Sequence, residues 1–475
     1  MALQTLKSPP KPLFAHETQS QPLHLQLKRR RKPHLGFPPF LPERPLRIGR
    51  SLVLAVSAKV GSDNGATKGE VKGADLATLG NLCVDIVLGV PSLPSGDAVK
   101  RKAYMERLSA SPPDKRYWEA GGNCNLSIAA ARLGLHCFAL GHVGDEVYGR
   151  FLLDVLREEG IDMVGMNEDI EAAALHSADY ETLLCWVLVD PFQRHGFCSR
   201  ADFSKEPAFS WMNELSGQVQ KAIRQSKILF CNGYVFDELS PSVIISALLC
   251  AMDAGTTTFF DPGPRGRTLF SGMPDEQKAL SLYLKLSDVL LLTSDEVESL
   301  TGISNPILAG QELIKKGTRP KWVVIKMGGK GSILITTSNI SCAPSFKVDV
   351  VDTVGCGDSF TAAVAYGYLH RLPPLHTLVL ANAVGAATAT GCGAGRNVAS
   401  LDKVLELLRE SNINEDDGMW SDIVHENSET PEIMALSKNT VNGSNSRIAH
   451  VSIQKVVSEL LPKLESIRKK QAVPS

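Results

Sequence analysis

The feature that most constrains the fold is a regular alternation of two hydrophobic patterns between residues 213 and 326. Segments with apolar residues at helical spacing alternate with short, nearly continuous apolar runs. The helical segments are 219–224, 243–252, 278–286 and 308–316, and the apolar runs are 228–231, 257–260, 289–292 and 322–326. This alternation predicts a parallel sheet covered by helices, because parallel strands are buried on both faces. Ligands of such sheets bind beyond the carboxyl ends of the strands.

A glycine-containing turn at residues 352–360 carries the strongest chemical signal. It reads Asp-Thr-Val-Gly-Cys-Gly-Asp-Ser-Phe, follows β-prone residues 346–351 and precedes a small-residue helical pattern at 360–365. We expect the turn to open a helix, whose first N–H groups and positive dipole end attract anions. Asp358 then has two interpretations: a charge that stabilises the helix start, or a base beside a bound phosphoryl group. The local sequence favours neither.

The motif Asp-Thr-x-Gly-x-Gly-Asp resembles the second signature of the PfkB (ribokinase-like) family of sugar and nucleoside kinases. The resemblance covers roughly residues 75–410. It implies an α/β fold, the ribokinase-like three-layer α/β/α sandwich with a mainly parallel sheet and a small β lid. It also implies that Gly355, Cys356 and Gly357 form the anion hole and that Asp358 is the catalytic base. ATP and Mg²⁺ would be the cofactors.

The first substrate-binding residue is expected in residues 74–90, which read as two strands separated by a break. Asp85 lies inside the second apolar run, where a carboxylate is costly unless something pairs with it. It is either a satisfied structural residue or a ligand-binding one, and the resemblance favours contact with substrate hydroxyls. The lid is expected at residues 86–120 and 175–200.

A second group of substrate-binding residues is expected at the start of a helix. Gly121 and Gly122 precede a small-residue helical pattern at 126–134 that ends at a glycine. This segment resembles the family's first signature, which implies that Gly121, Gly122 and Asn125 contact the substrate. The spacing from the glycine pair to Asn125 is one residue shorter than usual, which blurs the role of Asn123.

The nucleotide site is expected on later loops. Lys326, Gly328 and Gly331 follow a strand and resemble the family's nucleotide-proximal loop, although a plain hairpin turn would look the same. The G-x-x-x-x-G-K-[ST] spacing of a P-loop is absent from the sequence. By resemblance, Asn382 borders the adenine, and the backbone near residues 391–395 holds a monovalent cation such as K⁺.

Two further motifs depart from the family pattern. Residues 261–265 resemble Asp-Pro-Asn-x-Arg, but Gly263 replaces the Asn and removes its side chain. Residues 293–296 resemble Asn-x-x-Glu, but Thr293 replaces the Asn. The resemblance implies that Glu296 acts on magnesium through water, as magnesium prefers, although Glu296 could equally be a first-turn helix charge.

Composition is informative mainly at the two ends. Residues 1–58 hold ten Lys/Arg against Glu17 and Glu43, so this Pro-rich leader has a net charge of +8. The net charge of the whole chain is −1. The remainder is therefore at −9, which argues against a general nucleic-acid role. The leader resembles a plastid transit peptide more than a nuclear signal or an anion-binding arm, and a disordered leader is a further alternative. Residues 411–475 read as a polar tail, with a terminal helix at 453–467.

Cysteine usage and hydropathy limit the compartment. The ten cysteines are scattered without a C-x-x-C pair, which favours a reducing compartment, here the plastid stroma. No apolar run has the length of a membrane helix. Cys356 is interpreted as a small side chain between two glycines. A low-pKa thiol at a helix start is the alternative, and its oxidation would then block the anion hole.

Two functions follow from this sequence. The first is an ATP-dependent phosphotransferase that phosphorylates an alcohol group of a small sugar or nucleoside-like substrate with Asp358 as base. The second is a catalytically weak or inactive kinase-fold protein that serves as a plastid binding or assembly factor. The departures at Gly263 and Thr293 favour the second, whereas the intact group from Gly355 to Asp358 favours the first. Homodimerisation through the lid is a further expectation.

Overall fold

The computed structural model describes residues 72–111, 114–166, 181–192, 194–392, 394–415, 420, 433–437 and 448–471. The leader at residues 1–58 lies outside the described residues. So do residues 175–180 of the expected lid and much of the 411–475 tail. No helix among the described residues is long and apolar enough to cross a membrane.

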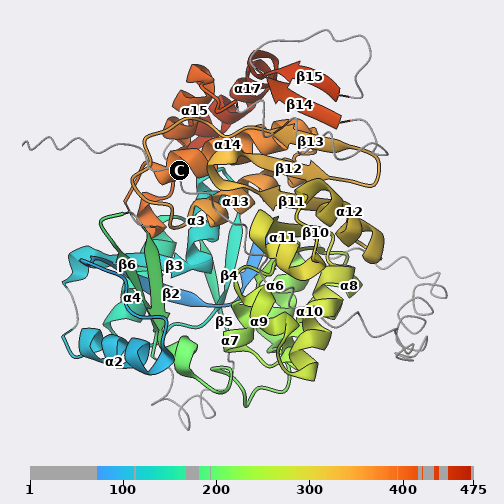
Figure 1. Cartoon of the computed structure of the whole chain (residues 1–475). Coiled ribbons are helices and arrows are strands. Elements are labelled where there is room, and N and C mark those ends of the chain that lie inside the picture. The colour runs from blue at the N-terminus through green and yellow to red at the C-terminus, as the bar shows by residue number, and fades with distance from the viewer. Residues whose placement is uncertain are drawn as a thin grey trace, which may run out of the picture. The chain divides into compact units, whose positions relative to one another are not determined.

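The main sheet of the described chain has 11 strands (Figure 1). Every neighbouring pair from β11 to β5 is parallel, and β12 is antiparallel to both of its neighbours. The order is β15 (Ile448–Ser452), β14 (Ile433–Ser437), β13 (Ile340–Ala343), β12 (Ser332–Ile335), β11 (Trp322–Lys326), β10 (Val289–Thr293), β9 (Thr257–Asp261), β8 (Ser226–Asn232), β1 (Ala74–Leu79), β4 (Cys137–Gly141) and β5 (Asp162–Gly165). The predicted apolar runs are the strands β8 to β11.

Helices cover both faces of this sheet and make two separate cores. Successive strand residues alternate between them: Leu76 and Ile228 belong to one core, Ala77 and Leu229 to the other. The first core is completed by α3 (Asn123–Arg132), α4 (Val147–Glu158), α13 (Cys356–Leu369), α14 (Pro374–Ala389), α15 (Leu401–Glu410) and α17 (Ile453–Gln471). The second is completed by α6 (Gly217–Gln225), α8 (Pro241–Asp253), α10 (Pro274–Leu286), α11 (Ser294–Thr301) and α12 (Pro306–Lys316). The expected three-layer α/β/α architecture is therefore confirmed.

A second sheet of four strands forms the lid. Its order is β3 (Trp118–Gly122), β2 (Leu82–Gly89), β6 (Leu183–Val189) and β7 (His195–Ser199), with α2 (Ala98–Ser109) beside it. Alternate residues of its strands point to opposite faces. Val84 and Trp186 belong to the first core, whereas Val187 packs with Val354 and Ala394 of the main body. One lid face therefore turns toward the glycine-containing turn.

Residues 346–351 do not form the strand that the sequence suggests. Phe346 makes one isolated bridge to Ile413, and the N–H of Lys347 donates to the carbonyl of Asn412. The segment follows β13 and lies along a cavity instead of pairing within the sheet. Its β-branched residues are typical of a strand. Whether such a segment pairs within a sheet depends on tertiary contacts, which a local pattern does not contain.

The C-terminal region extends the main sheet. β14 pairs in parallel with β13, and β15 pairs in parallel with β14 (Figure 1). α17 runs to Gln471, beyond the expected end at 467, and buries Leu460 and Leu464 in the first core. The two strands are not apparent from the sequence, because each has only five residues and polar sequence surrounds them.

Candidate active site

The glycine-containing turn opens α13, as the sequence predicts. Gly355 is the N-cap residue with φ of 77°, and a Cβ there would lie 3.1 Å from the Cβ of Ala394. Both facts favour glycine at this position. The N–H groups of Gly357 and Asp358 lie in the first turn of the helix, where no carbonyl of the preceding turn is available to accept them. Together with the helix dipole, they make residues 355–358 suited to an anion, and we call this segment the anion-binding turn.

Asp358 is held in place by an asparagine from another helix. Asn125 Nδ2 donates to Asp358 Oδ2 at 3.2 Å, and Asn125 Oδ1 accepts from the N–H of Gly395 at 2.8 Å. Burial raises the pKa of Asp358 to about 6, with a smaller raising effect from Asp261, although Lys326 and Asn125 oppose it. The carboxyl group is thus tuned toward neutral pH, as a general base requires. Asn125, expected on the substrate, also positions the carboxyl group of Asp358.

Asp85 lies on the lid face that turns toward this helix start. Its side chain is only 5% exposed, and the thiol of Cys83 donates to its Oδ1 at 3.4 Å. Burial raises the pKa of Asp85 to about 7, and the charges of Asp358 and Glu119 act in the same direction. The carboxyl group of Asp85 on the lid sheet and that of Asp358 on α13 are therefore close enough to interact electrostatically.

The glycines before α3 make room for neighbouring groups. A Cβ on Gly121 would lie 2.1 Å from Asp85 Oδ1, so the lid carboxylate occupies the space beside this glycine. Gly122 has φ of 58°, and a Cβ there would lie 2.5 Å from the carbonyl oxygen of Asn81. Both glycines therefore leave room for Asp85 and for the backbone of Asn81 through their missing side chains.

Asn123, whose role the sequence left unclear, is bonded to a residue at the end of β8. Its Oδ1 accepts from Asn232 Nδ2 at 2.9 Å, and its N–H donates to the carbonyl of Asn81 at 3.0 Å. Asn232 was missed by the sequence analysis. Its place at the carboxyl end of a predicted parallel strand was the available signal.

A charged cluster lies at the same edge of the sheet. Lys326 Nζ at the end of β11 pairs with Asp261 Oδ2 at the end of β9, and both side chains are largely buried. Burial lowers the pKa of Lys326, but Asp261 and Glu296 outweigh it, so the net pKa is raised. Burial and the charge of Asp261 raise the pKa of Glu296, while Lys326 opposes them. Lys326 therefore stays positive within reach of the anion-binding turn.

The two departures from the family pattern preserve backbone geometry. Thr293 Oγ1 accepts from the N–H of Glu296 at 3.2 Å, and Glu296 Oε2 accepts from the N–H of Thr293 at 2.7 Å, which is a complete capping box. Gly263 has φ of 52° and donates its N–H to Asp261 Oδ1 at 3.0 Å. Asn and Gly are the residues that most readily adopt such a φ, so the replacement loses an amide but keeps the turn.

Replacing Lys326 with Met is expected to lower the free energy of unfolding by about 3 kcal/mol, because it leaves Asp261 buried without its partner. The measurement is the denaturant midpoint with its slope. Lys316→Met is the matched control, since Lys316 pairs with Glu312 across a surface helix turn and should change stability by less than about 1 kcal/mol. Equal effects of the two changes would contradict a special role for the buried pair.

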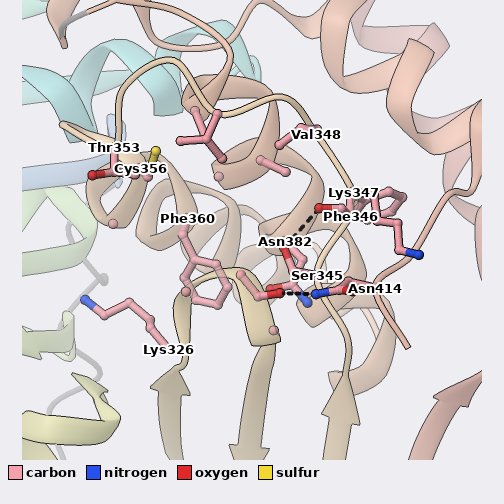
Figure 2. A pocket seen from close by; sticks show the side chains of 18 residues that line it. Lys326, Ser345, Phe346, Lys347, Val348, Thr353, Cys356, Phe360, Asn382 and Asn414 are labelled. Atoms are coloured by element: carbon pink, nitrogen blue, oxygen red, sulfur yellow. Dashed lines mark hydrogen bonds between the residues drawn. The ribbon is translucent and has the colours of Figure 1, made fainter. Parts of the chain in front are cut away.

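A cavity of about 430 Å³ adjoins the anion-binding turn. Phe346, Val348, Phe360 and Ala386 give it apolar walls, and Figure 2 shows Cys356 and Lys326 at one side and Lys347 and Asn414 at the other. The remaining lining residues are Gly328, Gly329, Gly331, Ser345, Val350, Thr353, Gly357, Asn382, Gly385 and Ala389. An apolar cavity that ends at an anion site fits a nucleotide base followed by its phosphates.

The residues expected to bind ATP take two different roles in this cavity. Gly328 and Gly331 form the hairpin turn between β11 and β12, with φ of 56° and 113°. Asn382 lines the cavity, but its Nδ2 donates to the carbonyls of Ala343 and Pro344, and its Oδ1 accepts from Ser332. Both hydrogens of the amide are thus used within the protein. Asn382 therefore braces the cavity wall through its amide, and its place beside the adenine stays a prediction.

The redox hypothesis for Cys356 is wrong in its premise. Burial raises the pKa of the Cys356 thiol to about 12, and the charges of Asp352 and Asp358 act in the same direction. A thiol with a raised pKa is protonated at neutral pH and reacts slowly. The helix dipole that suggested a thiolate is outweighed by burial and by two neighbouring carboxylates. Cys356 therefore serves as a small side chain.

The chain belongs to the pfkB family of carbohydrate kinases, which matches residues 112–400. Fructokinase-1 of Oryza sativa subsp. japonica is 27% identical over 353 residues, which cover 71% of this chain and 98% of that protein. An Arabidopsis thaliana protein named as a chloroplastic fructokinase-6 is 26% identical over 309 residues, 63% of this chain and 77% of that protein. The predicted family is confirmed.

Solved structures share the fold. The Arabidopsis thaliana ribokinase, complexed with ribose and ATP, superposes with a TM-score of 0.53 at 20% identity over 70% of this chain and 98% of the ribokinase. An E. coli protein assigned as a ribokinase II, in complex with ATP and Mg²⁺, superposes with a TM-score of 0.56 at 18% identity over 71% of this chain and 99% of that protein. The ribokinase-like fold is therefore confirmed.

Proposed function

We propose that this carbohydrate kinase transfers the γ-phosphoryl group of ATP to a hydroxyl of a small sugar, with Asp358 as the base. The observation that carries the proposal is the position of Asp358. It lies in the first turn of α13, between the cavity that Cys356 and Gly357 line and the lid face that bears Asp85. A hydroxyl held by Asp85 would lie between a base and an anion site.

In the proposed reaction, Asp85 binds hydroxyl groups of the sugar and Asp358 accepts the proton of the reacting hydroxyl. The N–H groups of the α13 turn stabilise charge on the transferring phosphoryl group. Lys326, beside Gly357, adds a positive charge on the nucleotide side. The lid limits access of water to the phosphoryl group, which suppresses hydrolysis.

The donor groups present are compatible with magnesium carried by ATP. No cluster of three metal-ligating side chains occurs among the described residues. Glu296 uses Oε2 in the capping box, so Oε1 remains for contact through water. Magnesium keeps several waters and binds mainly through phosphates when it accompanies ATP. When bound, it would neutralise phosphate charge.

The direct test uses the full chain with Mg-ATP and a panel of fructose, ribose and adenosine. Sugar-dependent ADP release above the rate with ATP alone supports the proposal, and fructose is the first candidate because several relatives are named fructokinases. No release with any sugar would overturn it. The alternative of an inactive binding or assembly factor has no support from the relatives or the solved structures, and Gly263 and Thr293 keep the local geometry.

The activity is expected to fall as the pH drops below neutrality. Asp358 has a pKa of about 6 and Asp85 of about 7, and each acts in its deprotonated form. Protonation removes the base and weakens the sugar contact, so the rate is lost as pH falls through this range and is full above it. The two carboxyls interact, so they titrate as a pair. We expect kcat/KM for the sugar to fall at least tenfold between pH 7.5 and 5. A flat profile would contradict the assignment.

We also propose that the chain is imported into plastids. The basic, Pro-rich residues 1–58 support this, as does the relative that is named chloroplastic. Incubation of the full chain with isolated chloroplasts should give a protease-protected product shorter by about the length of the leader. A protected product of unchanged length, or none, would contradict it. Homodimerisation through the lid and a monovalent cation near residues 391–395 stay predictions.

A further inference from the structure

A histidine of the lid contacts the first residue of the Asp-Thr-Val-Gly-Cys-Gly-Asp motif. His195, the first residue of β7, lies with Nε2 2.6 Å from Asp352 Oδ1. The two side chains are 12% and 3% exposed, and 157 residues separate them in sequence. The contact therefore joins the lid sheet to the segment that enters the anion-binding turn.

Asp352 fixes the backbone of that segment. The same Oδ1 accepts from the N–H of Val354 at 3.0 Å, and the N–H of Asp352 donates to the carbonyl of Ala389 on α14 at 3.2 Å. Val354 is followed directly by Gly355, the N-cap of α13. A change in the orientation of Asp352 would therefore shift the backbone of Val354 and, through Gly355, the N–H groups of the turn.

A second lid contact reaches the same place. Val187 of β6 is fully buried against Val354 and Ala394, with Val87 of β2 beside them. Val189, two residues further on, pairs with His195 across β6 and β7. The lid face that bears Asp85 thus meets residues 352–354 through one polar and one apolar contact.

We propose that His195 is a positioning residue, which orients Asp352 and thereby aligns the anion-binding turn when the lid covers the sugar. The proposal rests on the proposed function. Its physical basis is that the sugar is held on the lid by Asp85, whereas the phosphoryl group is held on the body. A contact between lid and turn then links the placement of one reactant to the placement of the other, and small misplacements of reacting groups can cost about 100-fold in rate.

The kinetic test compares three full-length variants. His195→Leu removes the donor and is expected to lower kcat about 10- to 100-fold with KM for ATP changed less than about threefold. His195→Gln keeps an N–H donor at similar reach and should restore kcat to within about fivefold of the parent. His376→Leu is the matched control: His376 is also 12% exposed and pairs with Glu459 at 2.7 Å, but away from the turn.

A double-mutant cycle with Asp352→Asn separates the contact from general damage. Asn keeps an oxygen that can accept from the N–H of Val354. If His195 and Asp352 act as a unit, the kcat losses of Asp352→Asn and His195→Leu should not add. Full additivity would overturn the proposal, as would a kcat for His195→Leu equal to that of the parent. Equal kcat losses in the His376 and His195 variants would overturn it too.

A measurement without turnover keeps the proposal distinct from the proposed function. Hydrogen–deuterium exchange of the peptide at residues 350–360 should be faster in His195→Leu than in the parent, and unchanged in His376→Leu. If the parent phosphorylates no sugar, the proposed function fails while the exchange still tests the contact. Unchanged exchange in His195→Leu would overturn the inference whether or not the chain is active.

Discussion

Replacing Asp358 with Asn is expected to lower sugar-dependent ADP formation by about 10²- to 10⁴-fold, the usual contribution of a positioned general base. Asn has nearly the same shape and can still bond to Asn125, but it cannot accept the hydroxyl proton. ATP affinity should change little, because Asp358 does not line the cavity that we assign to the nucleotide. The measurement is kcat with the best sugar of the panel, together with ATP binding by calorimetry.

The matched control for this change is Asp275→Asn. Asp275 is also an acid in the first turn of a helix, α10, but it is exposed and belongs to a different part of the molecule. If Asp358 only stabilised the start of α13, both variants would lose a few tenths of a kcal/mol in stability and keep their activity. That result would exclude Asp358 as the base.

Replacing Gly121 with Ala is expected to raise KM for the sugar about 10- to 100-fold. The new Cβ would lie 2.1 Å from Oδ1 and 2.2 Å from Cγ of Asp85, so the carboxylate must move. A hydrogen bond to a charged group is worth about 1.5–3 kcal/mol, which corresponds to this range of affinity. The measurement is KM for the sugar and, separately, KM for ATP, which should stay within about threefold of the parent.

Gly89→Ala tests whether the effect comes from Asp85 and not from the loss of a lid glycine. Gly89 ends the strand that bears Asp85, and a Cβ there would meet no atom within 4 Å. This variant should have parental kinetic constants. An equal rise in KM for the sugar in both variants would point to lid folding and would remove the support for Asp85 as a sugar ligand.

The main sheet and the helix start at residue 356 were predictable because their signals are local. Buried parallel strands such as β10 and β11 read as short apolar runs, and a Gly-x-Gly turn before small residues predicts a helix start. The family resemblance then assigned roles to Asp358 and Asp85, which the structure brings close enough to interact electrostatically.

The contacts that tune the site were not predictable because they depend on tertiary packing. Nothing in the sequence near Asn125 indicates that it bridges Asp358 and Gly395, which is 270 residues away. His195 lies in a segment without a motif. Cys356 had a local argument for a low pKa, and burial reversed it. In each case the deciding partner is far away in sequence.

The two strands that follow α15 extend the main sheet beyond residue 410, where the family resemblance ends. β14 pairs with β13, and Asn414, just after α15, donates through Nδ2 to the carbonyl of Gly329 at the nucleotide cavity. A chain that stopped at residue 410 would leave β13 with an unpaired row of N–H and C=O groups, which is a template for aggregation. We therefore propose that the catalytic unit extends to residue 471, so that removal of the C-terminal region would harm solubility and ATP binding together.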